Sequence, residues 1–279
     1  MIAILGSGAL GATVAHALAL RNRIDEVRLI DDQGAIASGK ALDIMQASPI
    51  ERFSTRVTAA DAIEAAAGAS VLVVADSAAA GVEHAGESGL SLLRRLAAIE
   101  RRAPIVCAGA LQRALIGRAI TELRLDTTRI VGSAPLALES ALRAMAGLAV
   151  DGTGTEVALR LVGVPPKDAV IGWEEGSIGG EPLSAHLAPH TIAGLNARIP
   201  GLWPPGPYAL GAAATRIAEA LVAGSRRTFS CFVALDAGPV RAAVAAMPVQ
   251  LQQGAVKRVL EPALTRQERT RLENALETT

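Results

Sequence analysis

Short apolar runs alternate with longer amphipathic runs through the first half of the chain. The short runs have strand length and lie at residues 2–5, 27–30, 71–74, 105–108 and 129–132. The longer runs have helical spacing and lie at residues 12–20, 37–45, 90–99 and 111–123. Because helices that cross between parallel strands produce this rhythm, the pattern predicts an α/β domain with a Rossmann-type, doubly wound parallel sheet of about six strands.

The pattern changes after Pro135, where a helix is followed by short strands and a turn region rich in glycine and proline. We expect helices at residues 136–146 and 210–222, and strands at residues 157–164, 170–173, 229–235, 248–251 and 256–260. Thr265 and Glu268 have the spacing of a capping box, which predicts the start of a last helix. The chain should therefore divide into a Rossmann domain at 1–134 and an α+β domain of the catalytic type at 135–279.

A glycine-rich segment directly follows the first expected strand and opens the first expected helix. It reads Gly6-Ser7-Gly8-Ala9-Leu10-Gly11, which is the GxGxxG spacing of dinucleotide-binding turns. The first glycine permits the tight turn, the second lets the backbone approach a pyrophosphate, and the third lets helix and strand pack closely. The helix N-terminus adds oriented N–H groups for the phosphates. These six residues are predicted to bind a dinucleotide, although a tight turn without a ligand would need the same glycines.

Two carboxylates follow the second expected strand. Asp31 lies where an acid would accept hydrogen bonds from the hydroxyls of the adenosine ribose, and Asp32 lies beside it. The negative charge of the pair should repel a 2′-phosphate, so we expect NAD (NADH) in preference to NADP. The alternative for Asp32 is a side chain that simply faces solvent.

Composition narrows the classes of partner. The 27 Lys and Arg residues balance the 27 Asp and Glu residues, so nucleic acid is not expected as a partner. Every apolar run is too short to span a bilayer, and Met1 leads straight into a strand, so we expect a cytoplasmic protein without membrane contact. Cys107 and Cys231 lie in expected strands without metal-ligand spacing, which predicts buried free thiols and no metal site.

Several separated segments resemble the lactate/malate dehydrogenase family, in the order in which that family has them. They are residues 27–31 with 39–43, residues 129–132 with 138–141, Trp173 with residues 177–183, and residues 213–222 and 256–260. The resemblance covers essentially the whole chain. It implies an NAD-binding protein with the fold of a 2-hydroxyacid dehydrogenase, and a homo-oligomer that is a dimer or tetramer.

The same resemblance identifies positions at which the family's chemistry is missing. The family uses a histidine to transfer the hydroxyl proton, an aspartate to orient that histidine, and an arginine to bind the substrate carboxylate. These positions carry Pro165, Glu139 and Leu142, respectively. Arg143 lies one residue late, which is about 100° around a helix, so it cannot simply replace the arginine.

The loop after the fourth expected strand also lacks the arginines that the family has there. No Arg or Lys occurs between Asp76 and Leu93, and Glu83 and Glu87 would repel a dicarboxylate. Ala108 stands where the family has an asparagine at the end of the fifth strand. Together these losses remove the mechanism by which the family reduces 2-oxo acids.

Weak candidates for a replacement chemistry are His84 on this loop, Lys167 just past the two prolines, and Glu139. Lys167 could act as a general base if it were desolvated, whereas the structural alternative is a turn lysine paired with Asp168. For His84 the alternative is a solvated loop residue. The remaining histidines, at positions 16, 186 and 190, are expected to be structural.

Three functions therefore stay open. The first is an NAD(H)-binding protein without ordinary 2-hydroxyacid dehydrogenase activity, acting as a regulator, sensor or assembly partner. The second is an active NAD-dependent oxidoreductase on a different, uncharged small molecule, with His84 or Lys167 transferring the proton. The third is an ordinary malate or lactate dehydrogenase, which would need an arginine that the sequence does not offer. The helix expected at 90–99 is a candidate for the oligomer interface.

Overall fold

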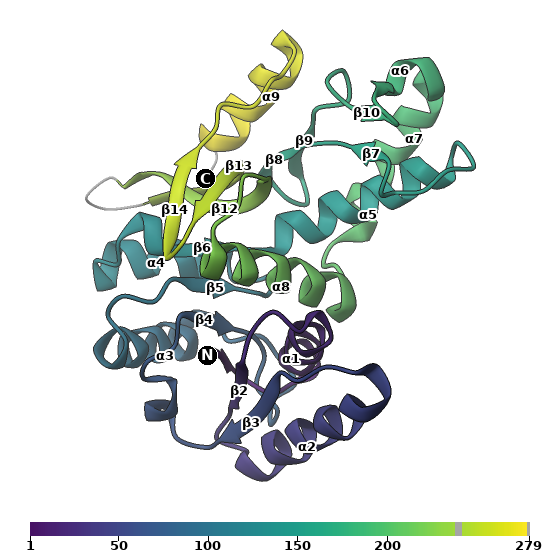
Figure 1. Ribbon diagram of the computed structural model, residues 1–279. Helices are drawn as coiled ribbons and strands as arrows, with labels where there is room; N and C mark the ends of the chain where they lie inside the picture. Colours follow the sequence, from purple (N-terminus) through teal and green to yellow (C-terminus); the bar gives the residue numbers. More distant parts are fainter. Residues whose placement is uncertain (238–241, 278–279) are drawn as a thin grey trace.

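The computed structural model describes residues 1–237 and 242–277, and its N-terminal part is a doubly wound α/β sandwich (Figure 1). Six parallel strands form the sheet in the order β3-β2-β1-β4-β5-β6. They are β1 Ile2–Leu5, β2 Glu26–Ile30, β3 Arg56–Ala60, β4 Val71–Val74, β5 Ile105–Cys107 and β6 Ile130–Gly132. Because the strand order reverses between β1 and β4, a ligand crevice is expected outside the carboxyl ends of these two strands.

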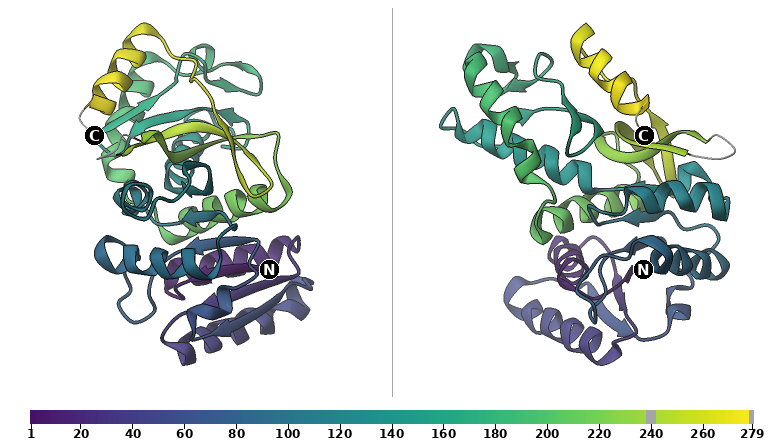
Figure 2. Two further views of the ribbon diagram at one scale, coloured as in Figure 1. Left: turned by 90° about the vertical axis from the view of Figure 1, so that its left-hand side faces the viewer. Right: turned by 180° about the vertical axis from the view of Figure 1, so that it is seen from behind.

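Helices cover both faces of this sheet, with α1 and α2 on one face and α3 and α4 on the other (Figures 1 and 2). The helices are α1 Ala9–Arg21, α2 Gly34–Glu51, α3 Gly86–Ile99 and α4 Arg113–Leu123, with short 3-10 turns η1 Ile63–Ala66 and η2 Thr127–Arg129. The strands are buried on both sides, which explains why they appear in the sequence as continuous apolar runs. The predicted α/β fold class is confirmed.

The sheet continues into the second half of the chain, because β12 pairs with β6 in antiparallel fashion and is followed in space by β13, β8 and β9. These strands are β8 Leu161–Val164, β9 Asp168–Ile171, β12 Thr228–Ala237 and β13 Ala242–Gln252, and β14 Ala255–Val259 pairs with β13. A second, small sheet has the order β11-β10-β7, with β7 Val157–Ala158, β10 Ser177–Ile178 and β11 Glu181–Pro182. The second half is therefore a mixture of helices and antiparallel strands.

Helices α5 Ala134–Leu148 and α8 Pro207–Ala223 pack against each other, and α8 also packs on α1 of the first half. The remaining helical segments are α6 Leu183–His186, α7 Pro189–Arg198, η3 Ile199–Leu202 and α9 Arg266–Glu277. The expected domain boundary at 135 falls in the first turn of α5. The division into two domains stays a prediction, because the main sheet contains strands from both sides of the expected boundary.

Two local predictions are confirmed. Thr265 and Glu268 form the capping box: Thr265 N–H donates to the Glu268 carboxylate at 2.8 Å, and Glu268 N–H donates back to Thr265 Oγ1 at 3.3 Å. Cys107 and Cys231 are buried free thiols. Burial raises the pKa of Cys107 to about 12 and that of Cys231 further, so neither thiol is ionised at neutral pH.

No helix in the described part of the chain is long and apolar enough to cross a membrane.

Candidate ligand-binding site

The glycine-rich turn joins β1 to α1 at the point where the strand order reverses. Gly6 has a φ of +102°, and a Cβ at this position would lie 2.3 Å from the carbonyl oxygen of Asp76. A Cβ on Gly11 would lie 2.1 Å from the carbonyl oxygen of Gly6. Both glycines are therefore required by the packing of the turn itself, whether or not a ligand binds.

The carboxylate of Asp76 lies directly on the N-terminus of α1. Its Oδ2 accepts a hydrogen bond from Leu10 N–H at 3.0 Å, and its Oδ1 accepts one from Gly11 N–H at 2.8 Å. A Cβ on Gly8 would lie 2.3 Å from Asp76 Cγ, so Gly8 provides the space for this carboxylate. The oriented amides that bind a pyrophosphate in such domains are thus already bound to an anion of the protein.

Asp31 lies directly after β2, as predicted, and its carboxylate is held by backbone amides. Oδ2 accepts hydrogen bonds from Ser7 N–H at 2.7 Å and Ala78 N–H at 2.9 Å, and Oδ1 accepts one from Gln33 N–H at 3.0 Å. Burial opposes ionisation, but these hydrogen bonds outweigh it and keep the pKa of Asp31 below its ordinary value. Asp31 is therefore ionised, and its carboxylate connects the glycine turn to the loop after β4.

Lys40, in α2, stabilises the same turn by hydrogen bonds. Its Nζ donates hydrogen bonds to the carbonyl oxygens of Ser7 and Gly8, at 2.5 and 3.0 Å. The lysine thereby satisfies two carbonyl groups at the start of α1 and places its charge on the turn. The sequence pointed to this lysine only as part of a family-like segment, not as a support of the glycine turn.

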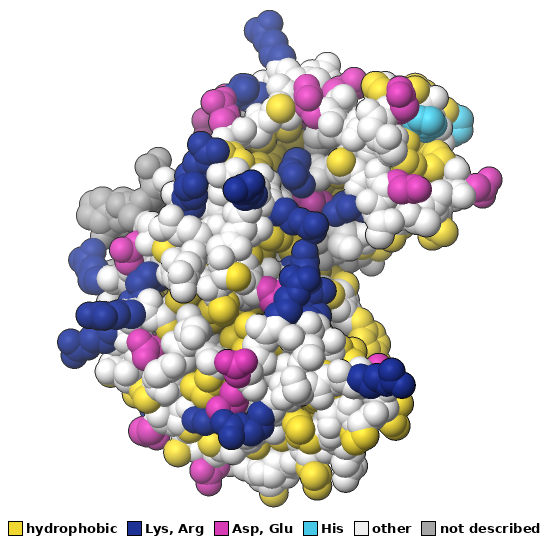
Figure 3. All heavy atoms as spheres, viewed as in Figure 1, with side chains coloured by type: hydrophobic (Ala, Val, Ile, Leu, Met, Phe, Trp, Pro, Cys, Tyr) yellow, Lys and Arg dark blue, Asp and Glu magenta, His cyan; other side chains and the backbone are white. Residues whose placement is uncertain are grey.

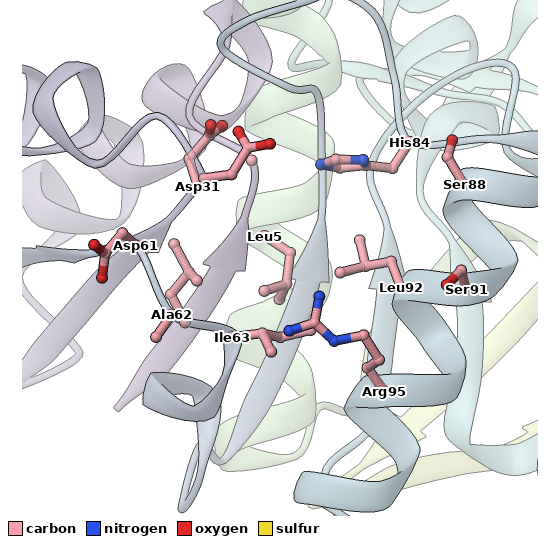
Figure 4. A pocket seen from close by; sticks show the side chains of 13 residues that line it. Leu5, Asp31, Asp61, Ala62, Ile63, His84, Ser88, Ser91, Leu92 and Arg95 are labelled. Atoms are coloured by element: carbon pink, nitrogen blue, oxygen red, sulfur yellow. The ribbon is translucent and has the colours of Figure 1, made fainter.

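A cavity of about 350 Å³ opens beside Asp31 and Asp32 (Figure 4). Of the predicted dinucleotide-binding residues it is lined by Gly6, Asp31 and Asp32, whereas Ser7, Gly8, Ala9, Leu10 and Gly11 form the adjoining turn. Its walls are apolar, with Leu5, Ile30, Ala62, Ile63 and Leu92, and its other polar residues are Asp61, His84, Ser88, Ser91 and Arg95. Apolar walls for a base, with acids at one end for ribose hydroxyls, suit the adenosine half of a dinucleotide.

His84 projects across this cavity toward Asp31, and Arg95 lies at the opposite end (Figure 4). Burial lowers the pKa of His84, and the charges of Asp31, Asp76 and Asp32 oppose this shift only in part. The imidazole is therefore neutral at physiological pH. His84 lines the cavity beside Asp31, which would hold the adenosine of a bound dinucleotide and not the nicotinamide that transfers a hydride.

The carboxylate of Glu83 is bound by the backbone that follows β5. It accepts hydrogen bonds from Ala110 N–H and Leu111 N–H, each at 2.8 Å, and a Cβ on Gly109 would lie 2.1 Å from its Oε2. Burial raises the pKa of Glu83 against these two hydrogen bonds, and the nearby charge of Asp76 adds to the rise. The loop after β4 thus inserts two carboxylates into the crevice, one at β1 and one at β5.

The crevice accordingly fits an NAD molecule only in part. The adenosine end has a cavity, apolar walls and acids in the right place. The pyrophosphate position does not fit, because Asp76 holds the Leu10 and Gly11 amides and adds negative charge there. Sequence reasoning missed Asp76. The signal was an acid just beyond a buried strand, opposite a glycine-rich turn.

The other candidates for replacement chemistry lie apart from this cavity. Lys167 is in the β8–β9 turn and does not line the cavity that contains His84. Glu139 is buried in α5, where it accepts hydrogen bonds from Ser230 Oγ and from Leu161 N–H at 3.3 Å. Leu142, where the resemblance places the family's carboxylate-binding arginine, is fully buried in the core.

A cluster of arginines lines a pocket between α5 and α8. Arg143, Arg160, Arg216 and Arg227 line a pocket of about 250 Å³ together with Glu139, and Lys and Arg side chains gather beside the hollow in the face shown in Figure 3. Arg143 Nε donates to the Val157 carbonyl oxygen at 2.6 Å, so it faces this pocket and not the position of Leu142. That Arg143 does not replace the missing arginine stays a prediction.

The buried carboxyl of Glu139 should make stability depend on pH. Burial raises its pKa, against the hydrogen bond from Ser230 and the charge of Arg160. The raised pKa means that the folded protein binds this proton more tightly than the unfolded chain. The free energy of unfolding should therefore fall by up to about 1.4 kcal/mol per pH unit above about pH 4.3, until the folded-state pKa is passed.

Glu139→Gln removes this titration while keeping a similar shape. We expect urea unfolding between pH 4.5 and 8 to show a growing advantage of the variant over the wild type as pH rises. A difference between the two proteins that stays constant over this range would contradict the raised pKa.

The strand order and the glycine turn at its reversal define the class of protein: a Rossmann-type dinucleotide-binding domain followed by a mixed second half. Residues 1–108 match the model of the NAD-binding domain of lactate/malate dehydrogenase. This part of the chain is therefore similar to the NAD-binding domain of that family, and the chain as a whole has the fold of these proteins.

Solved structures show this similarity over the full chain. Malate dehydrogenase from Salinibacter ruber is 23% identical with a TM-score of 0.86, and the match covers 99% of this chain and 94% of that chain. Malate dehydrogenase from Aeropyrum pernix is 19% identical with a TM-score of 0.85, covering 100% and 96%. Lactate dehydrogenase from Cryptosporidium parvum, solved with lactic acid and NAD, is 19% identical with a TM-score of 0.83, covering 99% and 94%.

Proposed function

We propose that this protein binds adenine nucleotides of the NAD type through its Rossmann domain and lacks ordinary 2-hydroxyacid dehydrogenase activity. It would act as a sensor, regulator or assembly partner. The NAD-binding domain supports the first part, and the cavity beside Asp31 and Asp32 supports a bound adenosine.

The proposed lack of ordinary dehydrogenase activity rests on one observation. The carboxyl of Glu139, where the resemblance places the residue that orients a histidine, is hydrogen-bonded to Ser230 and Leu161. The residue expected to be that histidine is Pro165, in the β8–β9 turn. A proline cannot transfer a proton, so the chain has no group at this position for the step that accompanies hydride transfer.

The alternative of an active oxidoreductase on an uncharged substrate gains little support. His84 lies in the adenosine-side cavity, and Lys167 lies in a turn outside it. The side chain bound by the amides that follow β5 is that of Glu83, a carboxylate. Self-association and a cytoplasmic location stay predictions from the sequence.

The proposed function makes NADH a better ligand than NADPH. Asp31, Asp32 and Asp61 line the cavity that would hold the adenosine ribose, and their charge would repel a 2′-phosphate. We expect NADPH to bind at least about tenfold more weakly in calorimetric titrations at one salt concentration, a difference of about 1.4 kcal/mol. Asp32→Asn should narrow the gap. Equal affinities in the wild type would overturn the roles given to these acids, and absence of binding by either nucleotide would overturn the proposed function.

A further inference from the structure

The loop after β4 is attached to the ligand crevice by its own carboxylates. Asp76 binds two amides of α1, and Glu83 binds two amides that follow β5. Asp76 and Glu83 also form an isolated β-bridge with each other, which holds the loop between them as one unit. The loop therefore carries two negative groups, each bound by paired backbone N–H groups in the crevice.

The turn is shaped around the first of these carboxylates. Only 6% of Asp76 is exposed, and a Cβ on Gly8 would lie 2.3 Å from both Cγ and Oδ2 of Asp76. The backbone is fixed as well, because Gly8 N–H donates to the Asp76 carbonyl oxygen at 2.9 Å. A diphosphate at this helix would have to displace an anion that already has its hydrogen bonds, and would meet its charge.

The open part of the crevice lies beyond this loop. The cavity of about 350 Å³ contains three carboxylates, Asp31, Asp32 and Asp61, against the single guanidinium of Arg95. Asp76 does not line this cavity, but it packs on Gly6, which does, and its charge acts on His84 inside the cavity. The surroundings of the cavity are therefore negative at the glycine turn, where a 5′-phosphate would leave the ribose. Uncharged ribose hydroxyls can donate hydrogen bonds to such acids, whereas phosphates are repelled.

We propose that the loop after β4 is a built-in substitute for the anionic part of a dinucleotide, so that the folded site selects an adenine nucleoside without a 5′-diphosphate. The inference rests on the proposed function, since it assigns the ligand to the same Rossmann site. NAD(H) binds by its adenosine end alone until Asp76 leaves α1. The loop thereby sets the ligand class of the site.

Calorimetric titration of adenosine and NADH into the wild type, Asp76→Ala and Asp76→Ser tests this. In the wild type NADH should bind no more tightly than adenosine. Both variants should bind NADH at least about tenfold more tightly than the wild type, while their affinity for adenosine changes by less than about threefold. Asp76→Ser keeps a short hydrogen-bond acceptor for the α1 amides without the negative charge. It therefore provides the same test if Asp76→Ala does not fold.

Glu87→Gln is the matched control, because Glu87 is an exposed carboxylate nearby that pairs with Arg118 on the surface. It changes the net charge by the same amount and should leave both affinities unchanged. If the wild type binds NADH about a hundredfold more tightly than adenosine and the Asp76 variants do not improve it, the proposed function stands and this inference is overturned. If no variant binds either ligand, both fail.

Discussion

Oxaloacetate, pyruvate and other 2-oxo acids should be reduced at least ~10⁴-fold more slowly by this protein than by an ordinary member of the family. The resemblance places the arginine that binds the substrate carboxylate at Leu142, which is fully buried. Losing one partner of such a charge pair costs about 2 to 5 kcal/mol. The resemblance places the proton-transferring histidine at Pro165, and losing that group forfeits a further ~10² to 10⁴ in rate. The two losses act on the same step, so we expect them to combine.

NADH oxidation at saturating 2-oxo acid measures this rate, in protein purified from a host that lacks its own malate and lactate dehydrogenases. The assay should include Asp76→Ala, because a weak affinity for NADH would otherwise be mistaken for missing chemistry. Turnover near ~10 per second in either protein would contradict the prediction. In that case His84→Ala and Lys167→Ala would identify which side chain transfers the proton.

Gly11→Ala should destabilise the fold by about 3 kcal/mol. The added Cβ would lie 2.1 Å from the carbonyl oxygen of Gly6, which is backbone and cannot rotate away. α1 would have to move off the turn, and with it the amides that bind Asp76. Urea unfolding followed by circular dichroism measures the loss.

Gly39→Ala is the matched control for this change. Gly39 lies inside α2, and a Cβ there would meet no heavy atom within 4 Å. Because alanine restricts the unfolded chain and favours helix, this variant should gain about 0.5 to 1 kcal/mol. A loss for Gly11→Ala no larger than about 0.5 kcal/mol would mean that α1 tolerates a shift on the turn.

The six parallel strands could largely be predicted, because strands buried on both faces stand out as continuous apolar runs. The exception is β3, Arg56–Ala60, which was not predicted since it lies at the sheet edge and buries only Val57 fully. Helix α7 was missed for a similar reason, as Leu195 is its single fully buried residue. Helix α2 runs on to Glu51 through Pro49, past the end that the apolar pattern indicated.

The sequence indicated that the glycine turn and Asp31 lie together, but not that Asp76 binds the same turn. The glycine turn and Asp31 lie together because both follow neighbouring parallel strands, which is local information. The position of the Asp76 carboxylate depends on how the loop at residues 77–84 folds back, through the Ala78 N–H bond to Asp31 and the His84 N–H bond to Ala75. Such contacts between distant residues leave no periodic signal in a single sequence.

The close contacts of the glycine turn bear on how such proteins are recognised from sequence. Selection for folding alone would retain glycine at positions 6, 8 and 11, because a Cβ at any of them would lie less than 3 Å from an atom of Asp76 or Gly6. The glycine motif would then remain in the sequence after the protein had lost the ability to bind the cofactor. Among relatives of this chain, the residue type at position 76 is the better guide: a small neutral side chain leaves the helix amides free, and an acid there closes them.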